Sequence, residues 1–110
     1  MNIAGAGKRV RVYTGEQHKA PGHHEPLWET ILEFLQSEGA AGATMFRGLA
    51  GFGAHSKIHM ARFADLAPDL PVLVEWIDTP ERVARLLPTI TDLVTSGTIT
   101  LEDIEIVKST

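Results

Sequence analysis

The sequence predicts an α+β fold in which a four-stranded antiparallel sheet carries two helices on one face. Three observations lead to this prediction. Strand-like and helical segments alternate in the order β, α, β, long loop, β, α, β. With 110 residues, the chain has room for one domain. Its composition, 44% hydrophobic and 22% charged, is typical of a folded globular protein.

The first half of the chain contains a strand, a helix and a second strand. Residues 8–14 alternate between apolar and polar, which is the period of a half-exposed strand, and residues 1–7 are expected to form a flexible N-terminus. Pro26 opens a helix whose apolar residues recur at helical spacing until Gly39 ends it. Residues 43–50 are apolar and bracketed by glycines, which favours a second strand.

A long loop separates this strand from the next one. Residues 51–70 greatly exceed the usual hairpin connection, and loops of that length in compact domains are normally functional or mobile. Within this segment, residues 57–63 are also compatible with a strand arm. Residues 71–77 carry the strongest strand signal of the chain. We therefore expect residues 8–110 to form one domain that carries the loop.

The last third of the chain contains a helix and a final strand. Thr79 is expected to cap this helix, Pro80 to open it and Gly97 to close it, while Pro88 predicts a kink. The strand that follows changes its alternation near residues 102–103, which predicts an interruption there. Two βαβ units of this length predict a ferredoxin-like βαββαβ sandwich.

Charge and composition exclude several classes of function. The formal charge of −4 makes nucleic acid a poor partner. The absence of cysteine excludes disulfides and thiolate chemistry, and it fits a reducing compartment. No apolar run reaches the roughly 20 residues that a membrane span needs, so a cytoplasmic location is expected. No nucleophile, base and orienting group occur together in a recognisable order, so we expect no enzymatic activity.

One face of the predicted sheet has no helix to cover it. Arg9, Arg11 and Tyr13 alternate with the apolar residues of the first strand and belong to that face. Because so small a domain buries only about two thirds of its surface, we expect other subunits to cover this face.

A glycine-rich stretch after the second strand is the strongest candidate for a ligand site. Gly48, Gly51 and Gly53 would let backbone N–H groups approach a phosphate closely, with Arg47 and Phe52 beside them. The stretch has neither the P-loop ending nor the dinucleotide-binding spacing. The alternative interpretation is a strand that needs glycines for a bend or bulge.

Other residues leave their alternatives open. Arg47, in an apolar strand, needs either Glu75 across the sheet or a ligand phosphate as its partner. Trp28 and Trp76 are expected in the core or at a subunit contact. His55 and His59 stand four residues apart, but this spacing joins two metal ligands only on a helix, so no metal site is expected.

Several short motifs together resemble the PII-like family catalogued as domain of unknown function 190. The resemblance covers roughly residues 8–108. The motifs are Tyr-Thr-Gly-Glu at 13–16, Gly-Ala-Thr at 42–44, Arg-Gly-x-x-Gly-Phe-Gly at 47–53, Ile-His at 58–59 and Asp-Leu-Pro at 69–71. That family is similar to the PII signalling proteins, which are trimers that bind adenine nucleotides in clefts between subunits. PII proteins use a long loop after the second strand to contact their targets.

The resemblance implies a homotrimer, a nucleotide site and a loop that contacts a protein target such as a transporter or channel. The nucleotide-binding residues it implies are Arg47, Gly48, Gly51, Phe52, Gly53, Glu75, Gly97 and Thr98. The partner-loop residues it implies are His55, Lys57, His59 and Arg62. Residues 54–68 are expected to be mobile without a ligand.

One departure from the PII pattern bears on the choice of nucleotide. Where PII proteins have Gly-Asp-Gly-Lys, this chain has Thr-Leu-Glu-Asp at 100–103. The phosphate-binding lysine is therefore missing, and Glu102 and Asp103 would repel a polyphosphate. AMP or ADP is expected to bind in preference to ATP. The alternative function is metal or inorganic-ion tolerance, as in the similar CutA fold.

Overall fold

The computed structural model describes residues 2–53, 57–61 and 69–110 of the chain. Its elements follow one another in the order β1 (Ile3–Gly15), α1 (Leu27–Ser37), β2 (Ala43–Arg47), β3 (Ala50–Gly51), β4 (His59–Met60), β5 (Pro71–Asp78), α2 (Pro80–Leu93) and β6 (Thr98–Ser109).

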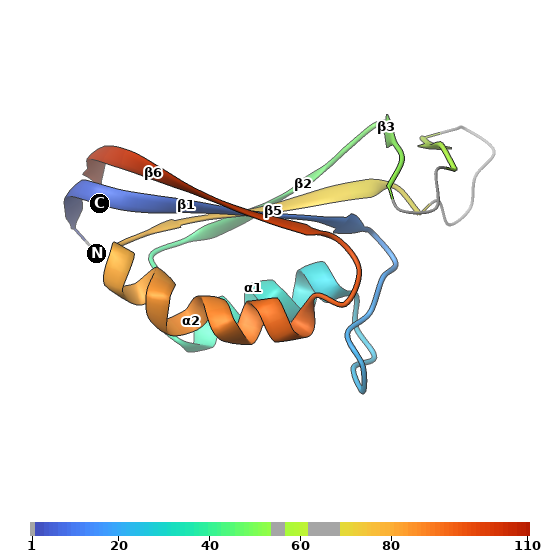
Figure 1. Cartoon of the computed structure of the whole chain (residues 1–110), viewed down its shortest axis with the longest axis horizontal. Helices are drawn as coiled ribbons and strands as arrows, with labels where there is room; N and C mark the ends of the chain where they lie inside the picture. Colours follow the sequence, from blue (N-terminus) through green and yellow to red (C-terminus); the bar gives the residue numbers. More distant parts are fainter. Residues whose placement is uncertain (1, 54–56, 62–68) are drawn as a thin grey trace.

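The main sheet has the strand order β2-β5-β1-β6, and every neighbouring pair is antiparallel. Both helices lie against the same face of this sheet (Figure 1). Val10 and Val12 of β1 and Val74 and Trp76 of β5 share that face through their register, and all four are 1% exposed. The core therefore lies between sheet and helices, and the predicted α+β sandwich is confirmed.

The opposite face of the sheet carries no helix in the part of the chain that the structure describes (Figure 1). Arg9, Arg11 and Tyr13 of β1 alternate with the buried valines and point to this open face. Tyr13 is 42% exposed. The sequence prediction for these three residues is confirmed.

Strand β1 starts earlier than the alternating pattern indicated. The sequence analysis placed residues 1–7 in a flexible N-terminus, but residues 3–7 are part of β1 and pair with β6. This segment consists mainly of Gly and Ala, so it has no apolar alternation to reveal a strand. Gly7 leaves room for the side chain of Ile106, whose Cδ1 lies 2.5 Å from where a Cβ of residue 7 would stand.

Strand β6 is continuous, so the interruption predicted near residues 102–103 is wrong. Its register with β1 is regular from Thr98 to Ile106, and the shift between the strands occurs farther along, between Ile3 and Gly5 of β1. The change of phase means that the apolar residues of β6 move from one face of the sheet to the other. This change of face occurs where the residues of β1 that lie opposite them are glycines.

The predicted second strand divides into two pieces. β2 ends at Arg47, and Ala50–Gly51 instead pairs with His59–Met60 in a separate two-stranded sheet. The N–H of Ala61 donates to the carbonyl of Leu49 at 2.8 Å. The predicted long loop thus begins as a short strand arm at one end of the molecule (Figure 1).

The bounds of the helices differ from the predicted ones by a few residues. Pro26 is the N-cap of α1 rather than its first residue. Thr79 caps α2, as predicted, because its Oγ1 accepts a hydrogen bond from the N–H of Arg82 at 3.3 Å. α2 runs through Pro88 and ends at Leu93, short of Gly97. Neither described helix is long and apolar enough to cross a membrane.

A buried carboxylate at the end of β5 holds the loop between α1 and β2 and the start of α2. Asp78, at the end of β5, has no exposed surface. Its oxygens accept from the N–H groups of Ala41 and Thr79 at 2.8 Å, from the indole N–H of Trp76 at 3.0 Å and from Arg82 at 2.8 Å. Burial raises the pKa of Asp78, but these hydrogen bonds outweigh it, so the pKa lies below its ordinary value.

Candidate functional site

The candidate site lies at the end of the sheet where β1 and β2 finish and β5 begins. This end of β1 is held to the residues before β5. The N–H of Glu16 donates to the carbonyl of Leu70 at 2.8 Å, and the N–H of Gln17 donates to Oδ1 of Asp69 at 3.0 Å. Two of the sequence motifs, residues 13–16 and 69–71, therefore meet in space.

The glycine-rich motif joins them through Pro71. The N–H of Gly48 donates to the carbonyl of Pro71 at 2.7 Å, so this amide is already used within the chain. A Cβ on Gly48 or Gly51 would stand 2.9 or 3.0 Å from Cγ of Pro71. Close packing against Pro71 therefore favours glycine at both positions, which agrees with the alternative interpretation of the motif as a bend. Gly53, by contrast, has open space around its Cβ position.

Arg47 forms an ion pair that the sequence analysis did not predict. Its guanidinium Nη2 contacts Oε2 of Glu16. Arg47 pairs in the sheet with Val72 of β5, and Glu16 follows β1 on the other side of β5. The side chain of Arg47 is 58% exposed and that of Glu16 only 15%. A cation thus stands at the surface beside the glycines, bound to a largely covered carboxylate.

Glu75 does not pair with Arg47, which corrects that alternative. Arg47 is on the helix face of β2, whereas Glu75 is on the open face of β5, about 10 Å farther along the strand. Glu75 instead accepts a hydrogen bond from Nε of Arg11 at 3.0 Å. This hydrogen bond is the main reason that the pKa of Arg11 is raised. Within one chain, Glu75 is therefore not part of the site at Arg47.

Glu102 and Asp103 do not form an acidic pair, which corrects the reasoning about polyphosphate. Neighbouring residues of a strand point to opposite faces, and each carboxylate here has its own cation. Glu102 accepts from Arg9 at 3.0 and 3.2 Å and lies 3.5 Å from Arg11, while Asp103 pairs with Lys8. The hydrogen bond from Arg9 is the largest cause lowering the pKa of Glu102.

Gly97 and Thr98 belong to the same end of the sheet but to its other edge. Thr98 begins β6 and pairs with Tyr13. Gly97 has φ +146°, and a Cβ there would stand 2.3 Å from the carbonyl oxygen of Tyr13. β5 and β1 separate this edge from β2, which places the two groups of candidate residues about 14 Å apart. One chain does not bring them together.

The predicted partner-loop residues are described only in part. Lys57 is exposed and His59 belongs to β4, whereas His55 and Arg62 lie outside the described residues. The prediction that residues 54–68 are mobile also falls mostly on residues outside the description. The described arm exposes apolar side chains that the sequence analysis did not emphasise: Leu49 is 81% exposed and Phe52 is 71% exposed.

The described residues contain no group of three or more His, Asp or Glu side chains placed to hold a metal ion. The imidazole Nε2 of His18 lies 3.2 Å from Oγ1 of Thr95, and Nδ1 of His23 lies 3.5 Å from a carboxylate oxygen of Glu25. These contacts connect loops near the helix ends and gather no set of ligands.

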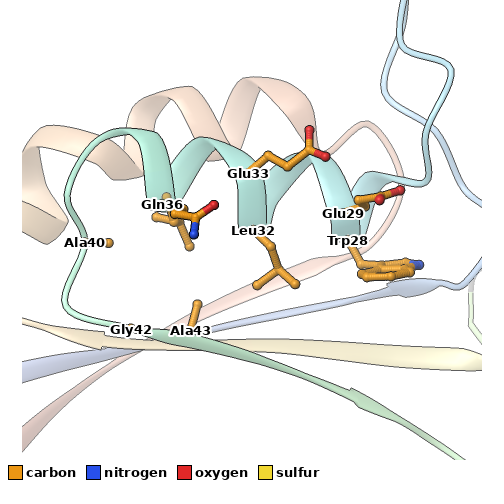
Figure 2. A pocket seen from close by; sticks show the side chains of 9 residues that line it. Trp28, Glu29, Leu32, Glu33, Gln36, Ala40, Gly42 and Ala43 are labelled. Carbon is orange, nitrogen blue, oxygen red and sulfur yellow. The ribbon is translucent and has the colours of Figure 1, made fainter.

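A concave region lies between α1 and β2, away from the candidate site (Figure 2). It is an open pocket of 460 Å³. Trp28 and Leu32 point from α1 toward the sheet, and Glu33 extends away from it (Figure 2). The indole N–H of Trp28 is buried and has no hydrogen-bond partner among the described residues. Trp28 packs against the core, as expected, and the pocket shares no residue with the glycine-rich motif.

Two residues that connect the segments of the site, Glu16 and Asp69, were not among the predicted site residues. Glu16 ends the motif at 13–16, although nothing else in the sequence distinguishes it from other surface carboxylates. Asp69 opens the motif at 69–71, and its carboxylate lies 2.9 Å from where a Cβ of Gly15 would stand. Their membership in these motifs was the available signal. Their partners depend on the strand order, which the motifs do not contain.

Comparison with known proteins finds relatives over most of the chain. The model of the family DUF190, described as "Uncharacterized ACR", matches residues 7–106. A UPF0166 protein of Aquifex aeolicus is 37% identical over 100 residues, covering 91% of this chain and 92% of that protein. A UPF0166 protein of Methanocaldococcus jannaschii is 30% identical over 102 residues, covering 92% of each.

Solved structures with the same fold are PII-like proteins. CPII of Thiomonas intermedia K12, a nitrogen regulatory PII-like protein bound to ADP, AMP and bicarbonate, superposes with a TM-score of 0.68 at 19% identity. The match covers 96% of this chain and 91% of that one. A protein of Thermus thermophilus described as a PII-like signaling protein gives a TM-score of 0.62 at 17% identity, covering 96% and 92%. The fold is therefore PII-like, and the chain belongs to the family of domain of unknown function 190.

Proposed function

We propose that this protein is a non-catalytic regulator that binds an adenine nucleotide in clefts between three copies of the chain. AMP or ADP is the proposed ligand. The segment 51–70 would contact a protein target, such as a transporter or channel, and the level of the nucleotide would control that contact. This role places the protein in the cytoplasm, where adenine nucleotides are abundant.

The observation that carries the proposal is the division of the candidate residues between two edges of the sheet. Arg47 and the glycines lie at the β2 edge, and Gly97 and Thr98 lie at the β6 edge of the same end. A site built from both groups needs the β2 edge of one copy beside the β6 edge of another. A closed ring of copies would repeat this junction at every contact.

The open face of the sheet supports assembly. Its centre carries two arginines and two carboxylates, and their ion pairs use both cations and both anions: Arg9, Arg11, Glu75 and Glu102. These four groups together have no net charge to repel a second copy. Tyr13, at the end of the same face, is the kind of residue that is enriched in subunit contacts.

The proposal of AMP or ADP rests on the ligands of similar structures. The Thiomonas CPII structures contain ADP, with AMP as well in two of the three. Glu102 and Asp103 point to opposite faces and each has a cation partner, so repulsion of ATP by an acidic pair does not support this preference.

Isothermal titration of the purified protein with ADP, with a chelator present, tests the proposal. Arg47→Ala should weaken ADP binding by about 1.5–3 kcal/mol, roughly 10- to 150-fold, because a charge-assisted contact to phosphate is lost. Arg85→Ala is the matched control. Its side chain is similarly exposed, at 55%, and its guanidinium pairs with Glu38 at 3.6 Å on the helix side. This control should bind ADP like the wild type.

Light scattering measures the assembly in the same samples. The expected species is a trimer, and a monomer at micromolar concentration would contradict a site between copies. Equal losses of affinity in Arg47→Ala and Arg85→Ala would show that Arg47 acts only through net charge. Heat on titration with zinc or copper but none with ADP, AMP or ATP would favour the metal-tolerance alternative instead.

A further inference from the structure

The ion pair between Glu16 and Arg47 places an anion of the protein itself on the cation proposed to bind phosphate. Glu16 is held in place through its backbone, because its N–H donates to Leu70 at 2.8 Å and the next N–H, that of Gln17, donates to Asp69 at 3.0 Å. The backbone of Glu16 is therefore fixed beside the residues that lead into β5, and its carboxylate reaches Arg47 from there.

The two side chains differ in exposure, and this difference favours replacement of the Glu16 carboxylate at Arg47 by an anion from solution. The Arg47 side chain is 58% exposed, so an anion from solution can reach its guanidinium, whereas the Glu16 side chain is 15% exposed. Arginine has five N–H donors, and its ion pair with Glu16 is made through Nη2. A phosphate at Arg47 would either replace this carboxylate or lie next to it against its negative charge.

We propose that Glu16 is an internal competitor for the nucleotide phosphate at Arg47 and so sets the nucleotide concentration at which the site fills. This inference rests on the proposed function, since it concerns the same site. Glu16 acts through Arg47 and is a positioning residue rather than a ligand of the nucleotide. Glu16 weakens the binding of the phosphate part of the ligand and does not affect the adenosine part.

A consequence follows for ligands that differ in charge. Each added negative charge on the ligand increases its repulsion from Glu16, which stays near the site whether or not its carboxylate remains on Arg47. Removal of the Glu16 charge should therefore help ADP more than AMP. It should leave adenosine, which has no phosphate, unchanged.

The test is titration of the full chain with ADP, AMP and adenosine before and after Glu16→Gln. This substitution keeps the shape of the side chain and removes its charge. ADP should bind about three- to fivefold more tightly to the variant, since a partly exposed ion pair no longer competes. AMP should gain less, and adenosine should bind equally to both proteins.

Two controls separate this effect from a change of net charge or of structure. Glu38→Gln removes the same charge from another arginine pair, Glu38 with Arg85, and should not change ADP affinity. In the Arg47→Ala background, the gain from Glu16→Gln should fall below about twofold, because the contact on which Glu16 acts is absent. A merely structural role of Glu16 would persist in that background.

The outcomes separate the two proposals. No binding of any adenine nucleotide by the wild type would overturn the proposed function and this inference with it. ADP binding that is unchanged or weaker in Glu16→Gln, or tighter by the same factor with and without Arg47, would overturn this inference alone. If Glu16→Gln lowers the unfolding temperature markedly, Glu16→Asp replaces it. The shorter carboxylate withdraws from Arg47 and should also tighten ADP binding.

Discussion

Replacement of Asp78 by Asn should strongly destabilise the fold, although the two side chains are nearly the same size. The native carboxylate is fully buried and accepts hydrogen bonds from four groups, two of them backbone N–H groups. An asparagine side chain has a similar shape, but one of its two terminal atoms is an NH₂ group, which cannot accept from an N–H. On at least one side of residue 78, the NH₂ group then faces N–H donors of the protein, and neither can accept a hydrogen bond from the other.

The magnitude follows from the donors affected. Each terminal atom of Asp78 serves two donors: Oδ1 those of Thr79 and Arg82, and Oδ2 those of Ala41 and Trp76. Whichever oxygen becomes NH₂, two donors lose an acceptor that is fully buried, at roughly 1–3 kcal/mol each. We expect the free energy of unfolding to fall by about 3–5 kcal/mol, a large part of the roughly 5–15 kcal/mol that domains possess.

Urea unfolding followed by circular dichroism at one fixed protein concentration measures this loss. Asp103→Asn is the matched control, because Asp103 also pairs with a cation, Lys8, but its side chain is 86% exposed. The control should change the free energy of unfolding by less than about 1 kcal/mol. A loss below about 1 kcal/mol in Asp78→Asn would refute the reasoning from the buried acceptor.

The pH dependence of stability provides a second check on Asp78. The pKa of this carboxyl in the folded protein lies below its ordinary value of 3.8. The ionised group therefore contributes stability above pH 3.8, and this contribution is lost as pH falls through the lower, folded pKa. The wild type should lose stability more steeply than Asp78→Asn on acidification below about pH 4.5. Parallel curves for the two proteins would contradict this assignment.

The remaining predictions concern the β6 edge of the candidate site. Gly97→Ala should lower the free energy of unfolding by about 2–4 kcal/mol, because its Cβ would stand 2.3 Å from the carbonyl of Tyr13 at a φ of +146°. Gly42→Ala, with open space around its Cβ, should cost under about 1 kcal/mol in the same urea assay. The double variant Glu102→Gln with Asp103→Asn should leave the ratio of ADP to ATP affinity within about threefold under chelation, and a larger shift toward ATP would restore the acidic-pair hypothesis.

The fold could be predicted because its main determinants are local. Apolar alternation in the strands at 8–14 and 71–77 and the two amphipathic helices are properties of short segments, and the order of segments restricts the topology. The errors occurred where the local signal was absent or ambiguous. Residues 3–7 form a strand through pairing with β6 and not through their own pattern. The phase change in β6 has its explanation in the glycines of a different strand.

The candidate site could be predicted less completely than the fold. Three of the motifs meet at one end of the sheet. The partners within the site depended on which strand lies between which, and this information is not local. Arg47 reaches Glu16 across β5, and nothing in the sequence favoured Glu16 over Glu75 as its partner.

The faces of the strands, by contrast, could have been used more fully from the sequence. Glu102 and Asp103 are neighbours in a strand, so a period of two is enough to place them on opposite faces. A continuous strand would therefore have excluded a shared action of the two carboxylates on one ligand, but the interruption predicted at 102–103 removed that constraint. The same rule sets Arg9 and Arg11 on one face, where two cations so close together require anions. Glu75 and Glu102 supply them, from the two strands that flank β1.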